Sequence, residues 1–319
     1  MRKTPVALIA LSLSAAALVG CAPAASINGV ACERPSDTIG SLVDAEGKLG
    51  AEPRVDLGSP IHVSSTQLSD AVTGEGTAIT DDNQLFSIDL VLYGGSDARR
   101  VVATEFNGDL SRLSNLDSWR TQIPGIAEAL ECATEGSRII AAIAPEGLGE
   151  SAAGGLGFMS DESAIAVIDV NKVFLPHAEG RLRFNAGTGL PSVVRAPDGR
   201  PGVTIPTADA PTDLVVETLI QGEGEEVTLD TPVRVHYTGL LWDDGSIFDT
   251  SWDGPARLLD LSSTIQGFTD ALVGQKVGSQ VMVVVPPELG YGSDDNATIP
   301  ANSTLVFVID IVGLEAGTQ

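Results

Sequence analysis

The chain repeats itself once at a long interval, and this repeat constrains the fold more than any other feature. Six blocks match in the same order, with separations between about 141 and 152 residues. One pair is QIPGIAEAL at 122–130 and TIQGFTDAL at 264–272, and another is GSRII at 136–140 and GSQVM at 278–282. A period of this length indicates two tandem domains rather than a stack of short repeats. The length of 319 residues also suits two domains of ordinary size.

The same coarse secondary structure is expected in both copies. Runs rich in valine and isoleucine, bounded by glycine or proline, predict strands in the second copy at about 215–219, 233–237, 281–285 and 304–312. One short helix is expected at about 268–272, directly after Gly267. Many strands with one helix predict an α+β domain in which an antiparallel sheet wraps over the helix.

The organisation predicted from these patterns has five parts. The polar, glycine-rich residues 177–190 lack a clear period and indicate a connecting segment. The five parts are a leader at 1–20, a tether at 21–38, a first domain at 39–178, a linker at 179–189 and a second domain at 190–317.

The N-terminus has the pattern of an export signal with a lipid attachment site. Arg2 and Lys3 precede an apolar run at 6–19, which is shorter than the roughly 20 residues that span a bilayer. The run ends in Leu-Val-Gly-Cys at 18–21, which resembles a bacterial lipobox. We therefore expect an exported protein with a lipid on Cys21, anchored to the outer face of the bacterial cell membrane. An ordinary signal peptide with a chance cysteine remains the alternative.

Two further cysteines remain once Cys21 is set aside. An exported compartment is oxidising, so Cys32 and Cys132 are expected to form a disulfide. Two free buried thiols are the alternative. No pair of cysteines or of cysteine and histidine has the spacing of a metal site, so no metal is expected.

The second copy carries the most specific motifs. VHYTGLLWDDGSIFDTS at 235–251 is followed by TIQGF at 264–268, LGYG at 289–292 and IPANSTLVFVIDI at 299–311. This ordered set resembles the FKBP-type peptidyl-prolyl cis-trans isomerases. The resemblance implies two tandem FKBP-like half-barrels, the second being the isomerase domain, and implies catalysis without any cofactor.

The resemblance also implies a role for each matched residue. Phe248, Asp249 and Tyr291 would be the catalytic residues, with Asp249 at the polar edge and the Tyr291 hydroxyl offered to a substrate carbonyl. The expected substrate-binding residues, which line a proline pocket, are Tyr237, Ile265, Phe268, Ile299 and Phe307. The expected partners are proline-containing peptides or unfolded exported proteins, together with macrocyclic FKBP inhibitors.

Three positions depart from the family pattern. Ala256 stands where a second pocket phenylalanine is usual, which predicts a wider pocket. Phe268 replaces a tryptophan, and the arginine that often pairs with the Asp249 position is absent from 251–254. Arg257 is a candidate replacement, and Trp252 is expected to cover the rim.

The first copy lacks most of these residues. We matched Tyr93 to Tyr237, Val101 to Thr104 with Ile247 to Thr250, Ile126 to Phe268 and Ala166 to Phe307. No tyrosine follows Gly149 where Tyr291 would lie. The first copy is therefore predicted to be a degenerate FKBP-like domain that keeps the fold and loses the activity.

Charge excludes one class of partner and leaves two competing hypotheses. The formal net charge is −25, which opposes nucleic-acid binding. The favoured hypothesis is an exported isomerase that assists protein folding. The alternative is a non-catalytic FKBP-like chaperone or binding lipoprotein; a small-solute-binding lipoprotein fits the anchor but not the repeat.

Overall fold

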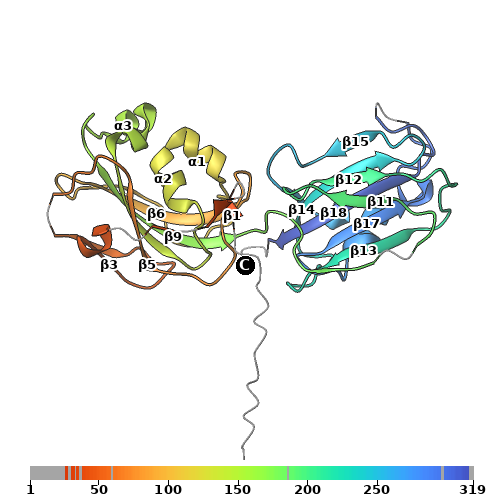
Figure 1. Cartoon of the computed structure of the whole chain (residues 1–319), viewed down its shortest axis with the longest axis horizontal. Coiled ribbons are helices and arrows are strands. Elements are labelled where there is room, and N and C mark those ends of the chain that lie inside the picture. The colour runs from red at the N-terminus through yellow and green to blue at the C-terminus, as the bar shows by residue number, and fades with distance from the viewer. Residues whose placement is uncertain are drawn as a thin grey trace, which may run out of the picture.

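The described residues form two lobes joined by one crossing of the chain. The computed structural model describes residues 26–27, 30–32, 34–35, 38–58, 60–184, 187–295 and 298–315 (Figure 1). We call residues 38–175 the first lobe and residues 176–315 the second lobe. The predicted leader at 1–20 and the predicted lipid site Cys21 lie outside the described residues.

The second lobe is built on an antiparallel sheet of seven strands. Its order is β10-β13-β17-β18-β14-β15, and β16 also pairs with β14. The central strands are rich in β-branched residues and buried along almost their whole length, as expected for strands covered on both faces. The strands are β10 (Arg181–Leu182), β13 (Val215–Gln221), β14 (Val233–Leu241), β15 (Ile247–Thr250), β16 (Arg257–Leu259), β17 (Gln280–Val285) and β18 (Leu305–Leu314).

The first lobe contains an equivalent sheet of five strands. Its order, β5-β8-β9-β6-β7, repeats the order β13-β17-β18-β14-β15 of the second lobe. Register shifts at 70–72, 87–88 and 92–93 correspond to those at 218–220, 234–235 and 239–240. The strands are β5 (Gln67–Val72), β6 (Phe86–Gly94), β7 (Arg100–Ala103), β8 (Arg138–Ile143) and β9 (Ala164–Val173).

One helix lies at the same place in both lobes and is held close to the sheet by a glycine. These helices are α2 (Pro124–Leu130) and α4 (Gln266–Leu272). A Cβ on Gly125 would lie 2.4 Å from Cγ2 of Ile143, and one on Gly267 would lie 2.4 Å from Cγ1 of Val285. Only glycine permits this approach, so the shared glycine of the repeat fixes the helix against β8 or β17.

The first lobe has two more helices than its sequence predicted. They are α1 (Leu116–Gln122), which begins with an Asn115–Ser118 capping box, and α3 (Glu150–Leu156). Gly154 and Gly155 lie within α3, and Gly157 ends it with a φ of 75°. Figure 1 shows α1, α2 and α3 on the same side of the first-lobe sheet.

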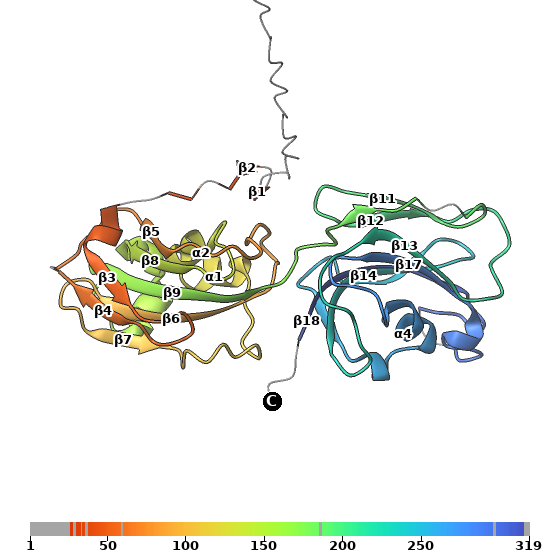
Figure 2. The same ribbon diagram turned by 90° about the horizontal axis from the view of Figure 1, so that it is seen from below.

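A two-stranded hairpin covers the opposite face of each sheet. The hairpins are β3 (Val43–Glu46) with β4 (Arg54–Leu57), and β11 (Ser192–Arg195) with β12 (Pro201–Thr204). Val193 and Val203 pack against a buried cluster that includes Trp242 and Met282. Figure 2 shows β11–β12 and α4 on opposite sides of the second-lobe sheet. Each lobe therefore has three layers, an α+β arrangement.

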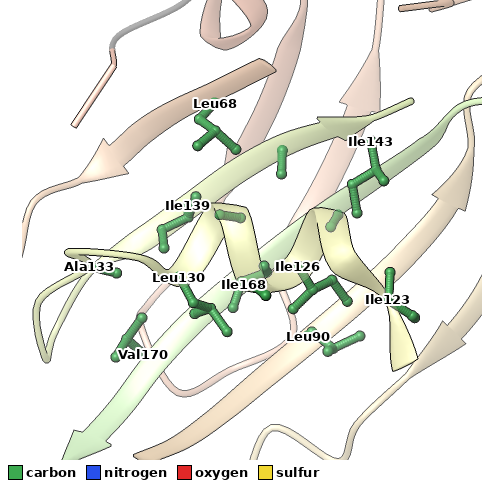
Figure 3. Packing of buried hydrophobic residues seen from close by; sticks show 14 of the residues in the cluster. Leu68, Leu90, Ile123, Ile126, Leu130, Ala133, Ile139, Ile143, Ile168 and Val170 are labelled. Atoms are coloured by element: carbon green, nitrogen blue, oxygen red, sulfur yellow. The ribbon is translucent and has the colours of Figure 1, made fainter. Parts of the chain in front are cut away.

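The largest cluster of the first lobe fills the space between its helices and its sheet. Figure 3 shows Ile126 and Leu130 of α2 directed toward Ile139 of β8 and Ile168 of β9. All four of these side chains are fully buried.

The connection between the lobes differs from the predicted linker. We expected residues 179–189 to be free of regular structure, but β10 lies within them and pairs with β13. Just before it, the Leu175 amide donates to the Val312 carbonyl at 3.0 Å. The linker is therefore part of the second-lobe sheet.

The segment before the first lobe is tied to it by a covalent bond. Cys32 and Cys132, the pair that the sequence predicted, form a disulfide across a separation of 100 residues. Arg34 adds a fork to Asp70 and also donates to the Ala129 carbonyl. β1 (Ser26–Ile27) and β2 (Val30–Ala31) form a small hairpin before the disulfide.

Candidate active site

Four aromatic rings from four different elements meet on the helix side of the second-lobe sheet. Phe307 of β18 is central, with its ring centroid 5.3 Å from that of Phe268 on α4 and 5.5 Å from that of Phe248 on β15. The Tyr237 ring of β14 lies 6.4 Å from Phe307 and 6.1 Å from Phe268. Three of the four contacts are edge-to-face, the geometry that aromatic pairs prefer.

A glycine makes room for these rings. A Cβ on Gly239 would lie 2.6 Å from Cζ of Phe248 and 3.0 Å from Cε1 of Phe307. The two rings therefore occupy space that any other residue on β14 would fill. Gly239 was not among the predicted site residues, although its place in the Tyr-Thr-Gly motif, two residues after Tyr237, was an available signal.

A polar group borders the rings on one side. The Tyr237 hydroxyl donates to the Asp249 carboxylate, and Nη1 of Arg257 donates to the same hydroxyl at 2.7 Å. Arg257 also forks onto Asp249, with distances of 3.1 and 3.2 Å. Arg257 thus provides the arginine that was missing from 251–254, as its proximity in sequence suggested.

The environment keeps the Tyr237 phenol protonated. Burial raises the pKa of Tyr237 well above its usual range, and the hydrogen bond to the Asp249 carboxylate raises it further. The guanidinium of Arg257 opposes this shift and lies 5.4 Å from the Tyr237 ring centroid. At neutral pH Tyr237 therefore presents a protonated phenol at the edge of an apolar surface.

The remaining predicted residues lie around the same rings. Ile265 precedes α4 and packs against the aromatic cluster, and Ile299 is buried within it. Tyr291 is 43% exposed in the loop between β17 and β18, and it is close enough to Tyr237 to contribute to raising the pKa of that phenol. The structure brings all eight predicted catalytic and substrate-binding residues to one region, while their roles stay predictions.

Three comparisons with known proteins bear on this region. Residues 223–312 match the model of a family described as FKBP-type peptidyl-prolyl cis-trans isomerase. A probable FK506-binding protein of Corynebacterium glutamicum is 37% identical over 114 residues, which cover 97% of that protein and 35% of this chain. This chain belongs to the FKBP-type peptidyl-prolyl cis-trans isomerases. An FK506-binding protein of Streptomyces anulatus is 31% identical over 120 residues, covering 97% of that protein and 36% of this chain.

A third relative covers the FKBP region within a longer protein. The FKBP-type peptidyl-prolyl cis-trans isomerase FkpA of Escherichia coli is 37% identical over 105 residues, which cover 33% of this chain and 38% of that protein. The family assignment therefore rests on the second lobe.

The first lobe fills the equivalent FKBP region with aliphatic side chains. In the first lobe, Leu90 and Leu92 of β6 pair with Ile168 and Ala166 of β9. In the second lobe, Tyr237 and Gly239 of β14 pair with Ile309 and Phe307 of β18. Leu90 and Leu92 thus stand where the second lobe has Tyr237 and Gly239. Trp119 of α1 and Leu156 of α3 also pack onto this cluster.

Two of our residue matches between the lobes were wrong. Tyr93 corresponds to Leu240 rather than to Tyr237, and it packs on the hairpin face of its sheet. The match was three residues out of register, and an odd shift moves a strand residue to the other face. On β7, Val101 and Val102 occupy the places of Phe248 and Asp249, one residue from our alignment.

Two predictions about the pocket rim were also wrong. Trp252 does not cover the rim, because it stacks on His236 at 4.5 Å, on the face of β14 away from the rings. Ala256 does not widen the pocket, because it packs with Leu85, Phe174 and Val312 where the two lobes meet. Its small side chain therefore affects the contact between lobes.

Two further findings concern the described residues as a whole. None of the helices in the described ranges has the length and apolar character needed to cross a bilayer. Within the same ranges, histidine, cysteine and acidic side chains nowhere gather in a group of three that could hold a metal ion.

Proposed function

We propose that proline isomerisation takes place at the four aromatic rings of the second lobe, with the Tyr237–Asp249–Arg257 group at the edge. The observation that carries this proposal is the convergence of Tyr237, Phe248, Phe268 and Phe307 beside one polar group, on strands and a helix of a single sheet. Rigid elements hold such a site better than loops do.

The reaction needs no bond to be broken. Rotation about the peptide C–N bond has a barrier of about 18–20 kcal/mol because resonance makes this bond partly double. The planar amide is strongly dipolar, and the twisted transition state has lost this resonance. An apolar surface therefore disfavours the planar form relative to the twisted one, which is binding selective for the transition state.

The polar groups at the edge of the rings orient the substrate and bind its carbonyl. The Tyr291 hydroxyl is accessible to a substrate carbonyl, and the Ile265 backbone precedes α4 at the rim of the cluster. Arg257 and Asp249 hold the Tyr237 ring in one orientation. Donors fixed before the reaction stabilise the rotating carbonyl without reorganisation.

Two neighbouring side chains on β15 give a matched test. Phe248 packs against the aromatic cluster, whereas Ile247 is 60% exposed. Phe248→Ala should lower kcat/KM for a proline-containing tetrapeptide by at least about tenfold, an ordinary effect for losing a transition-state contact. Ile247→Ala should change it by less than about twofold. Equal activity of the two variants would place the reaction elsewhere.

We further propose that the first lobe is a second FKBP-like unit without isomerase activity. The equivalent strand order and the equivalent helices α2 and α4 support the common fold. The aliphatic side chains of Leu90, Leu92 and Ile126 support the loss of the site. A macrocyclic FKBP inhibitor should therefore bind one molecule per chain, and two per chain would contradict this.

We also propose that the protein is exported and held by a lipid on Cys21 at the outer face of a bacterial cell membrane. The basic start, the short apolar run and Leu-Val-Gly-Cys at 18–21 support this. The Cys32–Cys132 disulfide supports an oxidising compartment. Cys21→Ser should move the protein from the membrane fraction to the soluble fraction; unchanged fractionation would rule out the lipid.

A further inference from the structure

A wide hollow in the described part of the chain lies beside the linker, away from the aromatic rings. It is a groove of about 1180 Å³. Thr77 and Thr80 of the first lobe form one wall, the linker from His177 to Phe184 forms another, and Val194 of β11 and Leu219 of β13 close it. The site described above uses none of these residues.

The groove exposes apolar side chains in a regular pattern. Leu182 is 82% exposed, Phe184 is fully exposed and Val194 is 72% exposed. Leu182 and Phe184 are two residues apart in an extended segment, so their side chains leave the chain on the same side. Clustered apolar exposure of this kind indicates a binding surface, whereas single exposed residues are ordinary.

The segment that carries these side chains is also an open strand edge. β10 pairs with β13 on one side, and the Arg183 amide extends this pairing by donating to the Leu219 carbonyl at 2.8 Å. β10 is the last strand of the second-lobe sheet among the residues that the structure describes. An open edge of this kind can accept an extended peptide as an additional strand.

The charge around the groove is opposite in sign to that of the whole chain. Its lining contains Arg183 and Arg195 and one acidic residue, Glu179, in a protein whose net charge is −25. Arg181, on the same segment, is mostly exposed and forms an ion pair with Glu223 at 3.2 Å. Arginines that alternate with Leu182 and Phe184 suit an occupant in which acidic and apolar residues also alternate.

We propose that the groove binds an extended, proline-free segment of an unfolded polypeptide that carries apolar and acidic side chains, as a second contact for the isomerase substrate. This proposal rests on the proposed function. Leu219 and Val193 belong to the hairpin-side cluster with Trp242, on the sheet face opposite the rings of Phe307 and Phe268. One long chain can therefore occupy both places, and each remains open when the other is filled.

A peptide without proline separates the groove from the isomerase site. The probe is a fluorescein-labelled dodecapeptide in which leucine and glutamate alternate, and its control has lysine in place of glutamate. Binding to the whole protein is followed by fluorescence anisotropy. Leu182→Ser/Phe184→Ser removes two exposed side chains, so the fold is not at risk. Leu229→Ser is the matched control, since Leu229 is 49% exposed outside the groove.

The expected result has three parts. The Leu182→Ser/Phe184→Ser variant should bind the leucine–glutamate peptide at least about tenfold more weakly than the wild type. The reason is that the bound peptide would bury these two apolar side chains, which the variant lacks. Leu229→Ser and Phe248→Ala should bind it normally, and the lysine peptide should bind more weakly to every variant. Tetrapeptide isomerisation by the double variant should stay within about twofold of the wild type.

Two results would overturn the proposal. One is equal binding of the leucine–glutamate peptide by the double variant and the wild type. The other uses vesicles of phosphatidylglycerol and phosphatidylcholine: if the double variant loses vesicle binding but keeps peptide binding, the surface contacts a membrane instead. Neither result depends on activity at the aromatic rings, so the proposed function is tested separately.

Discussion

At the scale of single residues, the two lobes show which side chains build the fold and which build the site. Gly125 and Gly267 are shared, because both helices approach a strand too closely for any side chain. Gly239 is not shared, because it leaves space for Phe248 and Phe307, and Leu92 fills the equivalent space in the first lobe. A search of the sequence for aromatic pocket residues misses Gly239, because this glycine acts by leaving room for the rings and adds no side chain of its own.

Gly239→Ala tests this account of the space between the rings. The new Cβ would lie 2.6 Å from the Phe248 ring, so the ring must move. The free energy of unfolding of the variant should therefore be lower than that of the wild type by about 1–3 kcal/mol. Isomerase kcat/KM should fall at least about tenfold because Phe248 leaves its place. Gly254→Ala is the control, with no atom within 4 Å of its Cβ. Equal stability and activity of the two variants, measured by urea unfolding and a tetrapeptide assay, would refute the account.

At the scale of elements, the sequence predicted β13, β14, β17 and β18, their counterparts in the first lobe and the helix after each glycine, because valine-rich runs and the long repeat are strong signals. It did not predict the hairpins β3–β4 and β11–β12 or the short strands β10 and β16. It did not predict α1 and α3, which are only seven residues each and, in α3, include two glycines. It also aligned β6 with β14 three residues out of register, because β6 is largely buried on both faces and burial alone does not fix the register. The pairing of β6 with β9 decides that register.

His236, on the face of β14 away from the aromatic rings, gives a prediction for the pH dependence of stability. Burial against Trp252 lowers the pKa of His236 from 6.5 to about 4, with small contributions from His177 and Arg200. Between these two pKa values the unfolded chain binds a proton at His236 that the folded protein does not bind. The contribution of His236 to the free energy of unfolding is therefore fully present above pH 6.5 and is lost as the pH falls toward 4. The difference is on the order of 3 kcal/mol.

His236→Phe keeps a ring against Trp252 and removes the titration. Between pH 7 and pH 4, the wild type should lose on the order of 3 kcal/mol more free energy of unfolding than this variant. Asp310, the cross-strand neighbour of His236, is present in both proteins. Its burial raises its pKa to about 6, which acts in the opposite direction and cancels in the comparison. Parallel curves for the two proteins in urea unfolding would show that His236 is not buried as described.

At the scale of the whole molecule, we propose that one lobe carries the reaction chemistry, while both lobes share the sheet order and one helix. The first lobe keeps the strand order, register shifts and helix of the second, yet Leu90, Leu92 and Ile126 form its core where the second lobe has the site. This division followed from the sequence, because the repeat allowed the two copies to be compared. The groove at the linker could not be predicted from the sequence, because its walls include Thr77 and Leu219, which are far apart in the chain.

The disulfide makes a prediction for the two lobes separately. Cys32 and Cys132 close a loop that spans most of the first lobe, and a loop of this length is worth up to about 4–5 kcal/mol in the unfolded-chain model. Cys32→Ser/Cys132→Ser should lower the thermal midpoint of the first lobe and leave tetrapeptide isomerisation within about twofold of the wild type. Calorimetry with an activity assay checks both, and a matching loss of activity would mean that the lobes do not act separately.

The central claim is that the second-lobe rings are the catalytic site and that the first lobe adds no activity. Phe248→Val/Asp249→Val gives β15 of the second lobe the residues that β7 of the first lobe has, Val101 and Val102. Isomerisation of a proline tetrapeptide by the whole protein should then fall to the uncatalysed rate, with the circular dichroism spectrum unchanged. Activity retained at a substantial fraction of the wild-type rate would contradict the account, because it would have to come from the first lobe or from another surface.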